Sequence, residues 1–205
     1  MSTSVIHIVD DDEAVRRALS LLAQSAGHPV AAHPSAESFL AHVPPDSGGC
    51  VVTDVRMPGM TGLQLQQAMR ERGLDLPIIM MTGHGDVAMA VEALKAGADD
   101  FLEKPFDDRV FLGSVGRALI RGQQLRRSRL QRDEIARRTA LLTAREQEVM
   151  ALIVEGAPNQ AVADRLGISV RTVENHRARI MDKMQAKRFS DLVRMVLTGV
   201  EAPED

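Results

Sequence analysis

Several residues in the first half of the chain could together transfer a phosphoryl group, and each stands at the end of a short apolar run. They are Asp10, Asp11, Asp54, Thr82 and Lys104. The apolar runs cover residues 5–9, 50–53, 78–81 and 100–103. Short apolar runs separated by longer amphipathic stretches are typical of parallel strands that alternate with helices. Because ligands bind beyond the carboxyl ends of such strands, we expect these side chains to meet at one edge of the sheet.

The residue types suit phosphoryl transfer to a carboxylate. Clustered carboxylates repel one another unless a hard divalent cation lies among them, and Mg²⁺, or Mn²⁺ in its place, suits one or two carboxylates with phosphate oxygens and waters. Asp10 and Asp11 would bind the metal, and Asp54 would be the nucleophile that carries the group as an acyl phosphate. Lys104 and the Thr82 hydroxyl would stabilise the charge on the transferred group. An acidic cluster alone more often marks a helix N-terminus, but the complete set favours a site.

Four separated motifs resemble the receiver domain of two-component response regulators. They are IVDD at residues 8–11, TDVRMPGMTG at 53–62, MTGHGD at 81–86 and FLEKPF at 101–106. MTGHGD, with AMAVEA at residues 88–93 after it, resembles the FixJ-type branch. The resemblance implies phosphorylation of Asp54 by a sensor histidine kinase. It agrees with the fold class that the alternating pattern predicts, an α/β doubly wound, flavodoxin-like sheet of five parallel strands.

The resemblance also implies roles for single residues at the metal site. It places the metal on Asp10, Asp11, Asp54 and the backbone carbonyl of Arg56. Asp12 would instead cap or support the helix that follows.

Other roles that the resemblance implies concern switching. The aromatic ring of Phe101 would swing between exposed and buried positions as the Thr82 hydroxyl follows the phosphoryl group, although plain core packing of Phe101 is the alternative. Arg56 and His84 would border the water that removes the phosphoryl group, or else would simply be solvent-exposed. The bond before Pro105 would be a cis peptide, and the surface formed by residues 86–103 would dimerise.

Helices are expected after each strand of the receiver domain, which would span residues 1–120. They are placed at residues 13–26, 35–42, 62–72, 86–97 and 107–119. Ser35 can cap the second helix, and Thr61 with Gln64 forms a capping box for the third.

Charge divides the chain into two unlike parts. Residues 1–116 carry 8 Lys and Arg against 16 Asp and Glu, whereas residues 117–205 carry 17 against 12. The basic excess indicates that the second part meets a polyanion. Residues 121–139 are rich in Arg and are expected to form a solvated helical linker, with a dimerising or DNA-contacting helix as the alternative. The spacing of Leu125, Leu130 and Ile135 does not support a coiled coil.

Residues 140–205 have the pattern of a small all-α domain of four helices. The start and stop signals are a capping box of Thr143 and Glu146, a stop at Gly167, and N-caps at Ser169 and Ser190. Two short helices joined by a Gly-containing turn indicate a helix-turn-helix. The motifs LTAREQEV at 142–149, NQAVA at 159–163 and RTVENHR at 171–177 resemble the LuxR-type DNA-binding domain.

The third helix of this domain carries the candidate DNA contacts. They are Arg171, Thr172, Glu174, Asn175, Arg177, Arg179 and Lys183. Glu174 and Asn175 suit base edges, while the arginines suit phosphates. Some related domains carry a cation in place of Glu174 and of Ala178, so the base preference stays open. His176 is compatible with either phosphate contact or helix packing.

The combined prediction is a transcription regulator rather than an enzyme. Its expected partners are a sensor histidine kinase, a double-stranded DNA operator and, on phosphorylation, a second copy of the chain. No membrane or small-molecule substrate is expected, and a cytoplasmic location is predicted because no basic leader or long apolar run occurs. One rival is an aspartyl-phosphate phosphatase, which commonly carries a second Asp where this chain has Arg56. The other is a DNA binder with a vestigial receiver, disfavoured because every site residue is present.

Overall fold

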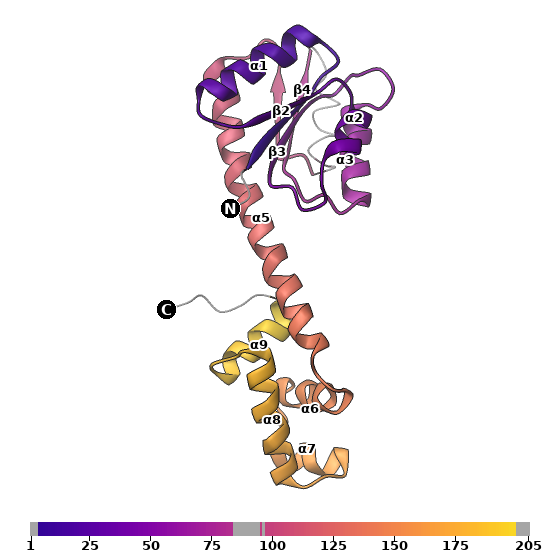
Figure 1. Ribbon diagram of the computed structural model, residues 1–205, viewed down its shortest axis with the longest axis vertical. Helices are drawn as coiled ribbons and strands as arrows, with labels where there is room; N and C mark the ends of the chain where they lie inside the picture. The colour runs from indigo at the N-terminus through magenta and orange to yellow at the C-terminus, as the bar shows by residue number, and fades with distance from the viewer. Residues whose placement is uncertain (1–3, 84–94, 96, 200–205) are drawn as a thin grey trace. The chain divides into compact units, whose positions relative to one another are not determined.

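The structure, a computed structural model, describes residues 4–83, 95 and 97–199 of the 205-residue chain (Figure 1). The chain divides into two units, Met1–Arg126 and Arg127–Asp205. Strands and helices alternate in the first unit, whereas the described part of the second unit is helical.

The first unit is built on one parallel sheet. Its strands are β1 (Val5–Val9), β2 (Val30–His33), β3 (Gly49–Asp54), β4 (Ile78–Thr82) and β5 (Asp100–Glu103). They lie in the order β2-β1-β3-β4-β5, and every neighbouring pair is parallel. This confirms the doubly wound five-stranded sheet predicted from the sequence. The strand order reverses between β1 and β3, which is where such sheets bind ligands.

Helices lie on both sides of this sheet, as Figure 1 shows. The described helices are α1 (Glu13–Ser25), α2 (Ala36–His42), α3 (Gly62–Glu71) and α5 (Asp108–Ala140). One core, around Phe111, packs α1 and the start of α5 against the sheet, and the other, around Phe39, packs α2 and α3. The helix expected at residues 86–97 lies outside the described residues, apart from residues 95 and 97.

The helix starts follow the predicted capping chemistry. The Asp12 carboxylate accepts a hydrogen bond from the amide of Ala14 at 2.8 Å, so Asp12 caps α1. Ser35 caps α2, and Thr61 and Gln64 form the capping box of α3. These side chains satisfy amide groups that have no partner within the first turn of a helix.

The helix expected to end at residue 119 continues to Ala140, because no strong helix breaker follows. Both ends of the expected linker are packed rather than solvated. Gly122 is packed within the first unit, where an added Cβ would come within 2.4 Å of the Gly49 carbonyl oxygen. Ile135 is 7% exposed in the core of the second unit, whereas Leu130 is 58% exposed. Only the middle of residues 121–139 is therefore solvated as expected.

The second unit contains the predicted helix-turn-helix. Its helices after α5 are α6 (Ala144–Val154), α7 (Asn159–Leu166), α8 (Val170–Met184) and α9 (Phe189–Thr198). Gly167 takes a left-handed conformation, with φ of 62°, between α7 and α8, and Ser169 caps α8. The core includes Val149, Ile153 and Ile180, so α8 is packed along one face.

The predicted N-cap at Ser190 is wrong. Helix α9 begins at Phe189, with Arg188 as its N-cap, so Ser190 lies within the first turn. The buried Asp191 accepts a hydrogen bond from the backbone N–H of Arg188 at 2.9 Å. This carboxylate binds an amide at the helix start, and the helix can therefore begin before the serine.

Two histidines lie side by side in the core of the first unit. His7 of β1 and His33 of β2 are each 7% exposed, and His7 Nδ1 lies 3.1 Å from His33 Nε2. The ring of Phe39 packs edge-on against both. Burial, with a smaller contribution from His33, lowers the pKa of His7 to about 4.

This pair predicts acid sensitivity of the first unit. Because the pKa of His7 is lower in the folded chain than its ordinary 6.5, the unfolded chain takes up a proton first as the pH falls. Stability should be fully present above pH 6.5 and should fall by up to about 3 kcal/mol as the pH approaches 4. Urea unfolding at a series of pH values, followed by circular dichroism, measures this slope. His7→Gln should flatten this slope, whereas the control His28→Gln, at a half-buried histidine outside the pair, should retain it.

Candidate functional site

The predicted phosphoryl site lies at the carboxyl edge of the sheet. Asp54 ends β3, Thr82 ends β4, and Asp10 and Lys104 directly follow β1 and β5. Lys104 Nζ lies 2.5 Å from Asp54 Oδ2 and 2.9 Å from Asp10 Oδ2. The backbone N–H of Lys104 donates to the carbonyl of Thr82 at 2.7 Å. Residues from four strands are therefore brought to one place, as the strand-end pattern predicted.

Lys104 balances two carboxylates that are largely withdrawn from water. The side chain of Asp10 is 1% exposed and that of Asp54 is 15% exposed. Burial alone would lower the pKa of Lys104, but hydrogen bonds to Asp54 and Asp10 outweigh burial and raise the pKa above its ordinary value. Lys104 therefore stays protonated at neutral pH and offsets the repulsion between the carboxylates.

Backbone groups hold the other carboxylate oxygens. The amide of Arg56 donates to Asp54 Oδ1 at 2.8 Å, and the amide of Asp12 donates to Asp10 Oδ1 at 2.9 Å. Gly62 begins α3 so close to β3 that an added Cβ would lie 2.4 Å from the Asp54 carbonyl oxygen. The loop from Asp54 to α3 therefore returns tightly past the main chain at the end of β3.

The donor set fits a hard divalent cation. Within the described residues no three His, Cys, Asp or Glu side chains converge on one point that could hold a metal ion, and Asp11 is exposed. However, Mg²⁺ commonly uses only one or two carboxylates and keeps several waters. The nearly buried Asp10 beside Asp54 supplies such a pair of carboxylates.

The structure also locates the residues assigned to switching. Phe101 of β5 is half-buried and packs against the core around Phe39. The Lys104–Pro105 peptide bond is cis, the form that the resemblance implied. His84 lies outside the described residues, as does most of the surface expected to dimerise.

The seven predicted DNA contacts divide into two groups on α8. Arg171, Glu174, Asn175 and Arg179 are exposed. Their spacing of three, four and eight residues places them on one side of the helix. The remaining three, Thr172, Arg177 and Lys183, make contacts within the second unit.

The contacts of Arg177 and Lys183 were not expected from the sequence. Arg177 donates to Asn159 Oδ1 at 3.2 Å, and its guanidinium lies 5.0 Å from the ring centre of Phe189. Lys183 Nζ lies 2.6 Å from Glu146 Oε2. None of the three pairs is visible in the sequence, because the partners are from 12 to 37 residues apart. His176 is half-buried, with an enclosed Nδ1 that has no hydrogen-bond partner in the described structure, which favours packing over phosphate contact.

Glu146 is the main residue that sequence reasoning undervalued. It was predicted only as part of a capping box with Thr143, which the structure contains. It is also 2% exposed, and its hydrogen bond to Lys183 is the largest cause that lowers its pKa to about 2. The pair joins the start of α6 to the end of α8.

Comparison with known proteins supports both units. The response regulator receiver domain matches residues 6–115, and the luxR family of bacterial regulatory proteins matches residues 140–196. The transcriptional regulatory protein FixJ of Azorhizobium caulinodans is 48% identical over 200 residues, which cover 98% of this chain and 95% of that protein. The chain belongs to the FixJ-type response regulators.

Solved structures agree with this assignment. The response regulator StyR matches with a TM-score of 0.83 at 38% identity, over 95% of this chain and 98% of StyR. Full-length FixJ from B. japonicum matches with a TM-score of 0.59 at 43% identity, over 96% of this chain and 97% of that one.

FixJ-type regulators are transcription factors of two-component systems and not enzymes, which confirms the predicted class. Their two domains imply a histidine kinase and DNA as partners, and receiver domains generally bind Mg²⁺ at the phosphorylation site. No helix in the described part of the chain is both long and apolar enough to cross a membrane.

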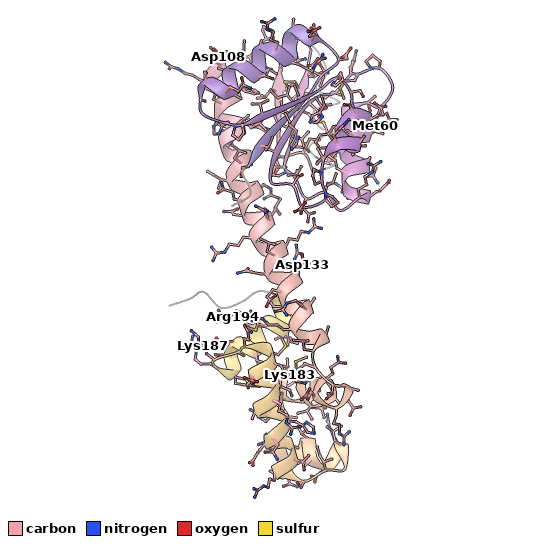
Figure 2. All side chains as sticks on the ribbon, in the orientation of Figure 1. Met60, Asp108, Asp133, Lys183, Lys187 and Arg194 are labelled. Atoms are coloured by element: carbon pink, nitrogen blue, oxygen red, sulfur yellow. The ribbon has the colours of Figure 1, made fainter. Side chains whose placement is uncertain are left out.

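The Glu146–Lys183 pair predicts a structural effect for a residue that was expected to contact DNA. Lys183→Ala should leave a buried carboxylate without its cation and destabilise the second unit by roughly 1–3 kcal/mol. Lys187, exposed three residues after α8, is the matched control, and Figure 2 labels both lysines. Lys187→Ala should leave stability unchanged in calorimetric unfolding. Equal stability of the two variants would show that the ion pair contributes nothing.

Proposed function

We propose that this regulator accepts a phosphoryl group on Asp54 from a sensor histidine kinase. An oxygen of the Asp54 carboxylate would form the new bond to phosphorus as the phosphorus–nitrogen bond of the donor phosphohistidine breaks. The observation that carries this proposal is the position of Lys104 Nζ, 2.5 Å from Asp54 Oδ2 and 2.9 Å from Asp10 Oδ2, at the carboxyl edge of the sheet. Its charge, held where the phosphoryl oxygens would lie, would stabilise the transferred group without rearrangement.

Asp10, Asp11, Asp54 and the carbonyl of Arg56 would hold Mg²⁺, or Mn²⁺, at this site. When bound, the metal would neutralise charge on the phosphoryl oxygens. The enclosed Thr82 would follow the phosphoryl group with its hydroxyl, and Phe101, which is already half-buried, would change its position with Thr82.

Replacement of the acceptor tests this assignment. Asp54→Asn should abolish phosphorylation and keep the fold, because the amide is nearly isosteric but cannot form an acyl phosphate. Incubation with a small phosphodonor and Mg²⁺, followed by intact-mass measurement, should show one stable phosphoryl group on the parent chain and none on the variant. Rapid release with turnover would favour a phosphatase, and no reaction of the parent would favour a vestigial receiver.

We propose that the exposed side of α8 binds double-stranded DNA in the major groove. Asn175 and Glu174 would contact base edges, and Arg171 and Arg179 would contact phosphates. Thr172, Arg177 and Lys183 would support the helix, since their polar groups already have partners in the unit.

Substitutions on α8 separate these roles. Arg179→Ala should weaken binding to all sequences. It should also reduce by about one the slope of the logarithm of the binding constant against the logarithm of the salt concentration. Asn175→Ala should instead change which base pairs are preferred, with a cost of roughly 1–3 kcal/mol at one position. Fluorescence anisotropy with operator variants at several salt concentrations distinguishes the two. A changed base preference in the Arg179 variant would reverse the assignment.

We propose further that phosphorylation joins two chains through the receiver surface of residues 86–103. Two linked DNA-binding units would gain operator affinity through effective concentration, with no change within either unit. Lys95 is exposed and helical, and belongs to this surface.

A charge reversal on this surface tests the dimer. Lys95→Glu should phosphorylate normally, remain monomeric in analytical ultracentrifugation and bind full operators weakly, while its binding to one half-site matches the parent. A large phosphorylation-dependent gain on a single half-site would instead indicate relief of inhibition within one chain.

A further inference from the structure

The loop between Asp54 and α3 carries backbone groups that the phosphoryl site needs. Its Arg56 amide donates to Asp54 Oδ1 at 2.8 Å. One end of the loop is fixed by β3 and the other by the Thr61 capping box. Between these ends Gly59 takes a left-handed conformation, with φ of 76°. Holding such a loop in one conformation costs conformational entropy, which a further contact can offset.

That contact comes from α2. Glu37, in the first turn of α2, accepts a hydrogen bond at Oε1 from the backbone N–H of Met60 at 2.9 Å. Figure 2 labels Met60, beside the start of α3. The carboxylate approaches so closely that a Cβ on Gly59 would lie 2.9 Å from Glu37 Oε1. The left-handed φ of Gly59, rather than this approach, is what favours glycine beside the contact.

The helix that carries Glu37 is itself held firmly. Phe39 is fully buried in the core, and Ser35 caps the helix. At the far end of α3, Arg72 Nη1 donates to the carbonyl of Leu40 at 2.8 Å. Helix α2 therefore holds both ends of the segment that runs from the Asp54 loop through α3.

The Glu37 carboxylate accepts hydrogen bonds from the Glu37 amide, from Ser35 and from the Met60 amide. These hydrogen bonds lower the pKa of Glu37, so its carboxylate stays ionised near neutral pH.

We infer that Glu37 is a positioning residue for the phosphoryl site, which it serves by holding the Met60 amide and thereby the loop that presents the main chain of Arg56. The inference rests on the proposed phosphorylation of Asp54 and on the proposed metal contact of the Arg56 carbonyl. Without Glu37 the Met60 amide would turn to water, and residues 56–60 would sample more conformations. The variant without Glu37 would then bind the metal more weakly, because binding would also have to order residues 56–60, at a cost in conformational entropy.

Metal titration tests the inference independently of phosphorylation. Full-length parent, Glu37→Ala, Glu37→Gln and the control Glu71→Gln would each be titrated with Mg²⁺ by isothermal calorimetry. Glu37→Ala should raise the dissociation constant about fivefold, the effect of one partly exposed charge-assisted hydrogen bond. Glu37→Gln should stay close to the parent, since its amide oxygen can still accept from Met60. Glu71→Gln removes an equal charge from an exposed side chain at the end of α3 and should leave the dissociation constant unchanged.

Phosphorylation by a small phosphodonor across a Mg²⁺ series gives the second measurement. Glu37→Ala should need about fivefold more Mg²⁺ for half-maximal rate, yet should reach the parental rate at saturation. A parental Mg²⁺ affinity in Glu37→Ala would overturn the inference. A loss shared fully by Glu37→Gln would assign the effect to charge and would also overturn it. If the parent binds Mg²⁺ but takes up no phosphoryl group, the proposed function fails while the calorimetric comparison still decides the role of Glu37.

Discussion

The site depends on one ammonium group shared between two carboxylates. Lys104 Nζ contacts both Asp54 and Asp10, and Asp10 is almost completely buried. Two adjacent carboxylates with so little access to water would be unfavourable without a cation, because their repulsion is poorly screened. The strand order that places β1, β3 and β5 in one parallel sheet is what allows three distant segments to form this contact.

In the second unit, too, cationic side chains join distant segments. Lys183 reaches the nearly buried Glu146, and Arg177 lies between Asn159 and Phe189. These contacts fix α8 against the helices around it. A helix that is held on its packed side can present Asn175 and its exposed neighbours in a defined orientation, which base recognition requires.

Helix α5 takes part in the packing of both units. Phe111 is buried in the first unit and Ile135 in the core of the second. Gly122 allows the helix to approach the start of β3, where a larger side chain would meet the Gly49 carbonyl. Residues 121–139, expected to form a linker, are therefore part of each unit at their ends, where the buried Arg138 donates to the Met184 carbonyl at 3.1 Å.

Much of this protein could be predicted from the sequence alone. Apolar runs, capping boxes and strand-end carboxylates depend on neighbouring residues, so they predicted the parallel sheet, the cap at Thr61 and the set around Asp54. The Ser190 cap failed because Asp191, three residues after Arg188, binds the amide at the helix start, so that the helix begins before the serine. The contacts of Glu37 with Met60 and of Glu146 with Lys183 were decided by the tertiary structure. Each joins residues more than 20 positions apart, and no local pattern determines which distant side chains the packing of helices brings within hydrogen-bond distance.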